Sequence, residues 1–328
     1  MTNKCTILTY HYVRDLVNSS FPNIKGLDTE EFIGQLNYLE RFYRFINVED
    51  LITSLYDGKH LPKNSVFLTF DDGYIDHYDT VFPILKSKGI QGCFFPPAEA
   101  ILESEVLDVN KIHFILASTN ANQILKELYK LLDKYRVDYK LETNDYYFSH
   151  FAKKGKYDMK EVVFIKKLLQ RELELEVRTK IIDRLFYKFV SKDVKSFSKE
   201  IYVTTGNLTR MIEEGMHVGS HGYSHKWLDS LSLSEQEYEI DKSLSFLRNL
   251  GVDMENWVIS YPYGGFNNET ISVIESRDCK LAFTTQVDFT NLALKNRFML
   301  ERFDTNDFPK NAFSDPNSLT EKIKDTKL

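Results

Sequence analysis

The chain has 328 residues, 42 of them basic and 48 acidic, which gives a formal net charge of -6 at pH 7. Such a chain has no overall positive field to hold a phosphate backbone, so a nucleic-acid partner is not expected. The hydrophobic share of 42%, with only 14 Gly and 8 Pro, is typical of a packed globular protein and excludes a disordered or fibrous one.

The N-terminal residues and the cysteines bear on the cellular compartment. Residues 1–15 reach charged side chains before any apolar run of signal-peptide length, and no window approaches the roughly 18 apolar residues of a membrane span. We therefore expect a soluble, cytoplasmic protein without a transmembrane segment. Cys5, Cys93 and Cys279 are odd in number and lack CxxC spacing, so we expect small buried hydrophobic residues and no disulfide or thiolate metal site.

Short apolar runs recur along the chain and are predicted to be buried strands. They lie at 6–10, 44–48, 66–70, 92–95, 216–220, 257–261 and 281–285. Helical patterns lie between them at 29–42 and at 78–89, where Gly89 ends the helix. A further helix is predicted to begin with a capping box at Ser234 and Glu237 and to run toward Gly251. This alternation predicts an α/β fold with a parallel sheet closed into a barrel.

Strand signals become rare between about residues 101 and 200, where charged, helix-forming residues dominate. Ile181, Leu185 and Phe189 fall on one helical face, so the segment is predicted to form amphipathic helices. We interpret it as a helical insertion into a single domain. Its role stays open between internal packing, a lid, a dimer surface and a membrane contact, and its mixed charges favour a solvated face.

Two adjacent aspartates, Asp71 and Asp72, end the apolar run at 66–70 and are followed by Gly73. Adjacent strand residues face opposite sides, so both carboxylates can serve one site only where the backbone turns, which Gly73 permits. In a barrel the carboxyl ends of the strands form the active-site face. The alternative is an ordinary Asp-Gly turn that caps a helix.

His221 and His225 follow the run at 216–220 and are four residues apart. In a helical turn this spacing places both imidazoles on one side, where they could share a metal ion, although Gly222 favours a loop instead. Two histidines and one carboxylate would leave coordination positions open for water, as catalytic sites do. A third segment, Pro262–Gly264, follows the run at 257–261. It forms either a simple turn or a loop whose N–H groups face an anionic oxygen.

The three segments TFDDG, SHGYSH and PYG, in this order, resemble the motifs of the polysaccharide deacetylase family, also called carbohydrate esterase family 4. The resemblance covers about residues 6–304, apart from the insertion, with LTYHYV, AFTTQ and MLERFD as supporting stretches. It implies a distorted (β/α) barrel of about seven strands and one catalytic domain over residues 1–328. It also implies an enzyme that removes an N-acetyl group from an amino sugar in a glycan or glycan precursor.

The resemblance implies a role for each motif residue. Asp72, His221 and His225 would bind a divalent ion, most often zinc, with cobalt, nickel or iron as alternatives. The ion would polarise the acetamido carbonyl and lower the pKa of the attacking water. Asp71 would be the catalytic base, and the backbone N–H of Tyr263 would help to hold the oxyanion. Neighbouring residues are expected to contact the substrate: Tyr74, Pro262 and Gly264.

The sequence departs from the family pattern at three places. Gly222 replaces the Ser or Thr usual after the first metal histidine, Ser260 replaces an arginine, and no histidine follows His225, so the family's usual C-terminal acid is absent. We therefore expect His11, at the end of the first strand, to protonate the leaving amine or to hold the substrate. Arg302 is expected to orient the base. A structural histidine and a surface ion pair are the alternatives.

Two other functions stay open. One is a catalytically inactive barrel that only binds glycans, which the missing acid and arginine favour. The other is a deformylase or deacylase acting on a lipid- or nucleotide-linked sugar. The presence of the base and of all three implied ligands favours an enzyme. The lack of an export signal favours an intracellular precursor in surface-glycan assembly, such as lipopolysaccharide or capsule, over a cell-wall polymer.

Overall fold

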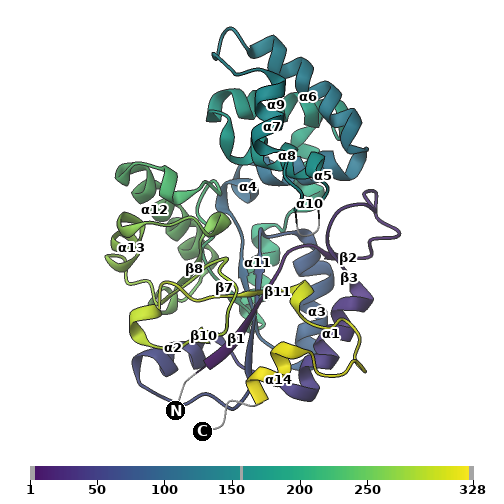
Figure 1. Cartoon of the computed structure of the whole chain (residues 1–328). Coiled ribbons are helices and arrows are strands. Elements are labelled where there is room, and N and C mark those ends of the chain that lie inside the picture. Colours follow the sequence, from purple (N-terminus) through teal and green to yellow (C-terminus); the bar gives the residue numbers. More distant parts are fainter. Residues whose placement is uncertain (1–3, 156–157, 325–328) are drawn as a thin grey trace. The chain divides into compact units, whose positions relative to one another are not determined.

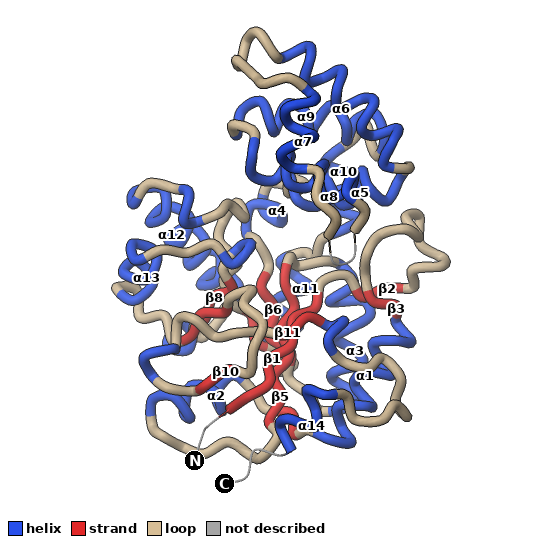
Figure 2. Tube along the Cα trace, viewed as in Figure 1, coloured by secondary structure: helices blue, strands red, loops and turns tan. Residues whose placement is uncertain are grey.

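The structure, a computed structural model, describes residues 4–155 and 158–324. The chain divides into two compact units. Unit 1 contains the described residues of Met1–Asp15, Gly26–Glu103 and Lys199–Leu328, and unit 2 contains Leu16–Lys25 and Ser104–Ser198. The strands all belong to unit 1, as Figure 2 shows in red, and the described part of unit 2 is built from helices and loops.

The strands of unit 1 pair mainly in parallel, and each predicted apolar run overlaps one of them. The main sheet has the order β10-β1-β5-β6-β7, and β11 pairs with β1 and β4 with β5. Among the strand pairs of this sheet in the described residues, only the β1 and β10 pair is antiparallel. A separate parallel pair is formed by β8 and β9, and another by β2 and β3. The bounds are β1 Lys4–Tyr10, β2 Val13–Arg14, β3 Leu27–Asp28, β4 Arg44–Phe45, β5 Ser65–Asp71, β6 Gly92–Phe95, β7 His217–Val218, β8 Val258–Ser260, β9 Leu281–Phe283, β10 Thr290–Asn291 and β11 Phe303–Asp304.

Isolated bridges connect the separate pair to the main sheet. Ser220 bridges Ile259 beyond β7, and Phe283 bridges Leu300 before β11. The predicted α/β fold is therefore confirmed. Continuous strand pairing does not close a full barrel in the described residues, because a single bridge takes the place of a ladder at these two positions.

Alternate residues of the strands enter two different apolar clusters. Because neighbouring strand residues face opposite sides, the two clusters lie on opposite faces of the sheet. The first contains Ile7, Phe67, Phe95, Val258 and Phe283. The second contains Leu8, Leu68, Phe94, Ile259 and Ala282 together with residues of α1, α3 and α12. Burial on both faces explains why these strands read as continuous apolar runs in the sequence.

The helices of unit 1 connect and cover the strands (Figure 1). The predicted helix at 29–42 is α1, and Gly89 ends α3 in the left-handed conformation, as expected. The capping box of α12 was predicted two residues too late, because it is formed by Ser232 and Glu235. The bounds are α1 Thr29–Phe42, α2 Val48–Tyr56, α3 Phe82–Lys88, α4 Ala98–Leu102, α11 Thr205–Glu213, α12 Leu233–Leu250, α13 Asn268–Glu275 and α14 Ser318–Lys324.

Unit 2 is a helical unit that also includes a segment from near the N-terminus. The ring of Phe21 contacts those of Phe114 and Phe197, with centroids 4.9 and 5.8 Å apart, which ties Leu16–Lys25 to the helices. The two ends of Ser104–Ser198 also meet, because Ser198 Oγ donates to the carbonyl of Glu105 at 3.0 Å. The helices are α5 Asp108–Ser118, α6 Ala121–Tyr135, α7 Asn144–Phe151, α8 Lys160–Lys167, α9 Leu175–Phe189 and α10 Val194–Ile201, which continues into unit 1.

Two further sequence expectations concern the whole chain. Cys5, Cys93 and Cys279 are buried and free, as predicted. Within residues 4–155 and 158–324, every helix falls short of the length and apolar character that crossing a membrane requires. The interpretation of residues 101–200 as an insertion into one catalytic domain stays a prediction.

Candidate active site

Asp71 lies at the carboxyl end of β5, on the inward-facing side of the strand. Phe67, Thr69 and Asp71 alternate along β5, so the carboxylate lies on the same face of the sheet as the side chains of Phe67 and Thr69. The backbone then turns, since Asp72 has φ 73° and Gly73 has φ 66°. Both aspartates are buried, each 3% exposed. The turn predicted from Gly73 therefore allows the two neighbouring carboxylates to serve one site.

Asp72, His221 and His225 form a buried cluster at the ends of β5 and β7. Their ligand-type atoms all lie within 4.8 Å of one another. Asp72 Oδ1 is 3.4 Å from His221 Nε2 and 3.3 Å from His225 Nε2. The structure thus brings together the three residues that the sequence resemblance implied as metal ligands. One carboxylate oxygen and two imidazole nitrogens are a donor set that suits zinc and similar divalent ions.

The tautomer of His221 gives a second reason why a cation fits this cluster. His221 Nδ1 lies 2.7 Å from the carbonyl oxygen of Ser260, which can only accept, so Nδ1 carries the proton. Burial alone would lower the pKa of His221, but the carboxylates of Asp72 and Asp71 raise it overall, because they favour the protonated ring. A cation in place of the Nε2 proton would meet the lone pair of this nitrogen and the carboxylate of Asp72. Burial lowers the pKa of His225, although Asp72 acts in the opposite direction, so this imidazole is neutral at pH 7. Such electron-rich atoms facing one another are stabilised by a bound cation.

The segment that carries the two histidines is a loop and not a helical turn. Gly222 has φ 71° and His225 has φ 56°, so the helical interpretation of the HxxxH spacing was wrong and the loop alternative holds. Glu239 of α12 fixes this loop. Its Oε2 accepts from the backbone N–H groups of Tyr223 and Ser224 at 3.0 and 2.8 Å, and its Oε1 accepts from the Ser224 hydroxyl. The sequence analysis missed Glu239, although a glutamate on the apolar face of a predicted helix signals a buried partner.

Arg302 pairs with Asp71 through two parallel hydrogen bonds. Nη1 donates to Asp71 Oδ1 at 2.9 Å and Nη2 to Oδ2 at 2.7 Å, and Arg302 is 2% exposed. Burial alone would raise the pKa of the Asp71 carboxyl, but the charge of Arg302, aided by His221, lowers it to about 2. The carboxylate is therefore ionised at neutral pH, and its position is fixed by a bidentate pair. The surface ion pair considered for Arg302 is excluded.

Ser260 explains how an arginine from the end of the chain can replace the one missing beside the PYG segment. Its hydroxyl lies 3.2 Å from Asp71 Oδ2 and 3.0 Å from Arg302 Nη2, between the two charged groups. A short side chain at position 260 leaves room for a guanidinium that comes from the residue directly before β11. Arg302 also donates to the carbonyl of Thr284 at 2.9 Å, which anchors it independently of the aspartate.

Tyr74 holds Asp72 from the side opposite to the histidines. Its hydroxyl donates to Asp72 Oδ2 at 2.5 Å, and its ring stacks on that of Tyr12 with a centroid distance of 3.9 Å. Tyr74 is fully buried. The expected contact of Tyr74 with the substrate does not fit this burial. Its hydroxyl orients a carboxylate, a role for which the sequence motif gives no separate signal.

The Pro262–Gly264 segment forms a short turn with an unusual backbone at its centre. Tyr263 has φ 57°, and its ring stacks on Trp227 at 4.6 Å and meets the edge of His225 at 4.6 Å. Gly264 has φ 73°, and a Cβ there would lie 2.2 Å from Thr285 Oγ1, so backbone conformation and packing together favour glycine. Pro262 is buried. Substrate contact by Pro262 and Gly264 and the oxyanion role of Tyr263 stay predictions, and Trp227 is a neighbour that the sequence analysis missed.

Backbone strain gathers at this site. Asp72, His225 and Tyr263 are three of the seven non-glycine residues with positive φ in the described part of the chain. For bulky side chains this conformation is rare and costs on the order of 1–3 kcal/mol per residue. The surrounding contacts therefore hold these three side chains where the unconstrained chain would not place them.

His11 directly follows β1 and is exposed. Its carbonyl oxygen lies 2.9 Å from Nε2 of the buried His77. Burial, Arg302 and His221 dominate the pKa of Asp71, and His11 adds a smaller lowering, so its imidazole lies within electrostatic reach of the aspartate. His11 is therefore exposed at the end of β1, and its role as proton donor or substrate contact stays a prediction.

Comparison with known proteins decides the family. A family model described as polysaccharide deacetylase matches residues 58–130 and 156–282, which is more than half of the chain. The chain belongs to the polysaccharide deacetylase family. The matched ranges contain Asp71 and Asp72, both histidines of the loop and the Pro262–Gly264 segment.

Curated relatives match over shorter stretches. YxkH of Bacillus subtilis is 27% identical over 92 residues, which are 28% of this chain and 33% of that protein. The poly-beta-1,6-N-acetyl-D-glucosamine N-deacetylase of Escherichia coli K12 is 31% identical over 86 residues, 26% of this chain and 12% of that protein. The matches thus span a third or less of the length of these relatives.

Solved structures share the fold over nearly the whole chain. The Streptococcus pyogenes deacetylase PplD in complex with acetate gives a TM-score of 0.56 at 17% identity, over 93% of this chain and 93% of that one. IcaB from Ammonifex degensii gives a TM-score of 0.55 at 17% identity, over 98% of this chain and 96% of that one. At such identities the likeness shows a shared fold alone.

Proposed function

We propose that this protein is a metal-dependent N-deacetylase that hydrolyses the acetamido group of an amino sugar. The observation that carries the proposal is the juxtaposition of two differently held carboxylates. Asp72 faces two imidazole nitrogens, and Asp71 is paired with Arg302 and lacks histidine contacts of that kind. A ligand beside a separate, ionised base is what metal-assisted hydrolysis needs. Membership of the polysaccharide deacetylase family supports the same reaction.

Each residue of the site has a separate role in the proposed reaction. Asp72, His221 and His225 would hold the ion, which when bound polarises the acetyl carbonyl and makes water a better nucleophile. Asp71 would take the proton of the attacking water, and Arg302 keeps its carboxylate ionised and fixed. The N–H of Tyr263 would donate to the developing oxyanion. His11 would return a proton to the leaving amine.

An amino-sugar glycan, or a precursor of one, is the substrate class we propose. The Escherichia coli relative is named for poly-beta-1,6-N-acetyl-D-glucosamine, which has such acetamido groups. A cytoplasmic precursor in surface-glycan assembly, zinc as the ion, and deacylation of a lipid- or nucleotide-linked sugar stay predictions. The missing arginine was one of two arguments for an inactive glycan-binding barrel, and it is weakened because Arg302 supplies a positive charge beside Asp71.

Metal analysis and an acetate-release assay on the same protein test this function. We expect about one divalent ion per chain and acetate release from an acetylated amino-sugar substrate by wild-type protein. His221→Ala should lose both, whereas His150→Ala, which changes an exposed histidine of α7 in unit 2, should lose neither. A chain that binds no ion, or a His221→Ala variant that keeps its ion and its activity, contradicts the proposed site.

Replacing Tyr74 by phenylalanine is expected to weaken divalent-ion affinity by about 10-fold to 100-fold, the usual effect of removing a hydrogen bond to a metal ligand. The hydroxyl that holds Asp72 Oδ2 is lost, while the ring and its stacking on Tyr12 are kept. Competition with a fluorescent chelator measures the affinity.

Tyr10→Phe is the matched control for this change. Tyr10 is also fully buried, and its hydroxyl donates to Gln35 Oε1 at 2.8 Å, away from the ligand cluster. Both variants lose one buried hydrogen bond, so similar losses of stability are expected. If the two variants bind the ion equally well, the Tyr74 hydroxyl stabilises the fold and does not orient Asp72 for the ion.

Replacing His11 by glutamine is expected to lower turnover strongly on an acetamide, whose amine leaving group needs a proton. Turnover on an activated aryl acetate should fall much less, because that leaving group hardly needs protonation. Rates on both substrates with one enzyme preparation measure the difference. Equal losses would indicate substrate positioning, and unchanged rates would return His11 to a structural role.

A further inference from the structure

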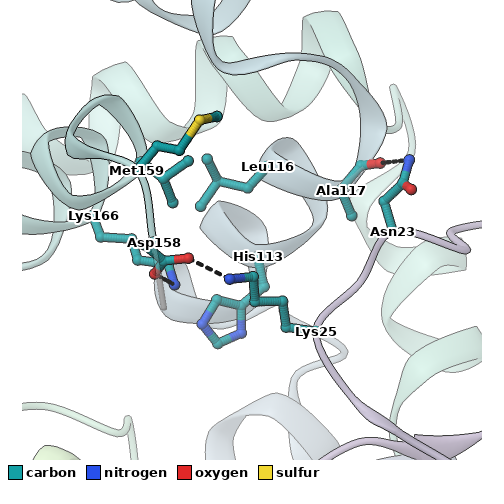
Figure 3. A pocket seen from close by; sticks show the side chains of 9 residues that line it. Asn23, Lys25, His113, Leu116, Ala117, Asp158, Met159 and Lys166 are labelled. Carbon is teal, nitrogen blue, oxygen red and sulfur yellow. Dashed lines mark hydrogen bonds and ion pairs between the residues drawn. The ribbon is translucent and has the colours of Figure 1, made fainter. Parts of the chain in front are cut away.

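Unit 2 contains a cavity of about 280 Å³ that the proposed reaction does not use (Figure 3). Its walls are formed by the segment Leu16–Lys25, by helix α5, and by α8 with the two residues that precede it, so every lining residue belongs to unit 2. Part of the wall is apolar and incompletely covered. Leu116 and Val162 are half-buried, and Met159 is 67% exposed. This apolar surface remains available to a ligand.

The opposite part of the cavity is charged and is centred on Asp158. Asp158 Oδ2 pairs with Lys166 Nζ at 2.8 Å, and Oδ1 pairs with Lys25 Nζ, so one carboxylate holds two ammonium groups (Figure 3). The side chain of Asp158 is 17% exposed, against 27% for Lys166 and 64% for Lys25. The carboxylate is therefore the more buried member, and both ammonium groups are more accessible to solvent.

The charges of this trio do not cancel. Two cations and one anion leave one excess positive charge, and neither lysine has a second carboxylate within ion-pair distance among residues 4–155 and 158–324. Each ammonium has three N–H donors, of which the bond to Asp158 uses one. Free donors and excess charge at the edge of a partly apolar cavity are complementary to an anion that also carries apolar surface.

We propose that this cavity binds a small amphiphilic anion, with a carboxylate or phosphate head at Lys25 and Lys166 and an apolar part against Leu116, Met159 and Val162. The volume is just below the roughly 300–1,000 Å³ of ordinary small-molecule sites, so the ligand is small. An aliphatic chain of medium length with one anionic head meets these requirements. The site is separate from the proposed deacetylase site, and neither depends on the other.

Asp158 affects the affinity for an anion in two opposite ways, so its substitution tests the direction of the change. Its carboxylate positions both ammonium groups, but it also repels the anion that we propose. Asp158→Asn removes the repulsion and frees donors on both lysines, so the variant should bind the anion more tightly. A lysine-to-glutamine change should weaken binding. A purely structural ion-pair trio predicts no binding in any of the three variants.

Calorimetric titration of the full chain with octanoate and with octyl phosphate tests the proposal, and the comparison decides between a carboxylate and a phosphate head. We expect at least one of them to bind to wild-type protein, and 1-octanol and octylammonium to bind at least tenfold more weakly. Lys166→Gln should lower the affinity for the anion by about tenfold, as loss of a charged hydrogen bond does. Lys25→Gln should act in the same direction and, since Lys25 is largely exposed, should leave the fold intact.

Lys130→Gln is the matched control, because Lys130 of α6 also pairs with an acid on unit 2 but does not line the cavity. Its affinity for the anion should equal that of the wild type. The proposal is overturned if neither anion binds, if 1-octanol binds as tightly as octanoate, or if Lys166→Gln and Lys130→Gln behave alike.

Discussion

Replacing Asp71 by asparagine is expected to lower turnover by about 10²-fold to 10⁴-fold, the usual contribution of a general base, while the ion stays bound. An asparagine has nearly the same shape as aspartate but cannot take the proton of water. The three ligand-type residues are unchanged, so metal content should stay at the wild-type level. Acetate release under saturating substrate, together with metal analysis of the same sample, measures both quantities.

Asp76→Asn is the control for this experiment. Asp76 is also a buried aspartate paired with an arginine, with its Oδ2 2.7 Å from Arg14 Nε, and it has no proposed part in the chemistry. Both variants leave an arginine without its counter-charge, so both are expected to lose stability. An Asp71→Asn enzyme with the turnover of Asp76→Asn would remove Asp71 from the mechanism.

Replacing Arg302 by methionine is expected to lower the free energy of unfolding by about 3–5 kcal/mol, because it leaves Asp71 as a buried and unpaired charge. Methionine keeps much of the apolar volume of arginine, so the lost charge and not a cavity dominates the effect. Urea denaturation at neutral pH measures the change. Turnover should fall as well, since the bidentate contact that orients the carboxylate is gone.

The Arg302 prediction has an internal check and an external one. In the double variant Asp71→Asn/Arg302→Met neither charge remains, so the double variant should be more stable than the sum of the two single losses implies. Arg210→Met breaks a surface pair with Glu214 in which the arginine side chain is 59% exposed. It should cost no more than about 1 kcal/mol. Similar losses in Arg302→Met and Arg210→Met would contradict the importance of the buried pair.

The strands and the ligand cluster could be predicted because local signals specify them. Strands buried on both faces read as apolar runs, and polar residues directly after such runs lie at the carboxyl end of the sheet. Asp72 and His221 follow β5 and β7 in this way. The order of the motifs then distinguished the expected metal ligands from the expected base, which the spacing of the residues alone could not do.

The features that the sequence did not reveal depend on contacts between distant residues. Leu16–Lys25 has no periodic pattern, and only the packing of Phe21 against rings of the helical unit assigns it there. Glu239 and Tyr74 act through single hydrogen bonds, which leave no repeating pattern. The start of α12 was misplaced because two overlapping Ser-x-x-Glu matches occur, and the one at Ser232 forms the cap.

The hydrogen bond between Ser198 and Glu105 has a consequence for the order of folding. Cys93 of β6 pairs with His217 of β7, although the helices of unit 2 come between them in the sequence. Non-local pairing is slow because the chain must close a long loop first. Helices form from local contacts, and their folding would bring residues 105 and 198 together. The loop that remains to be closed is then short, so we expect the helices to form first and the second half of the sheet to be completed on them.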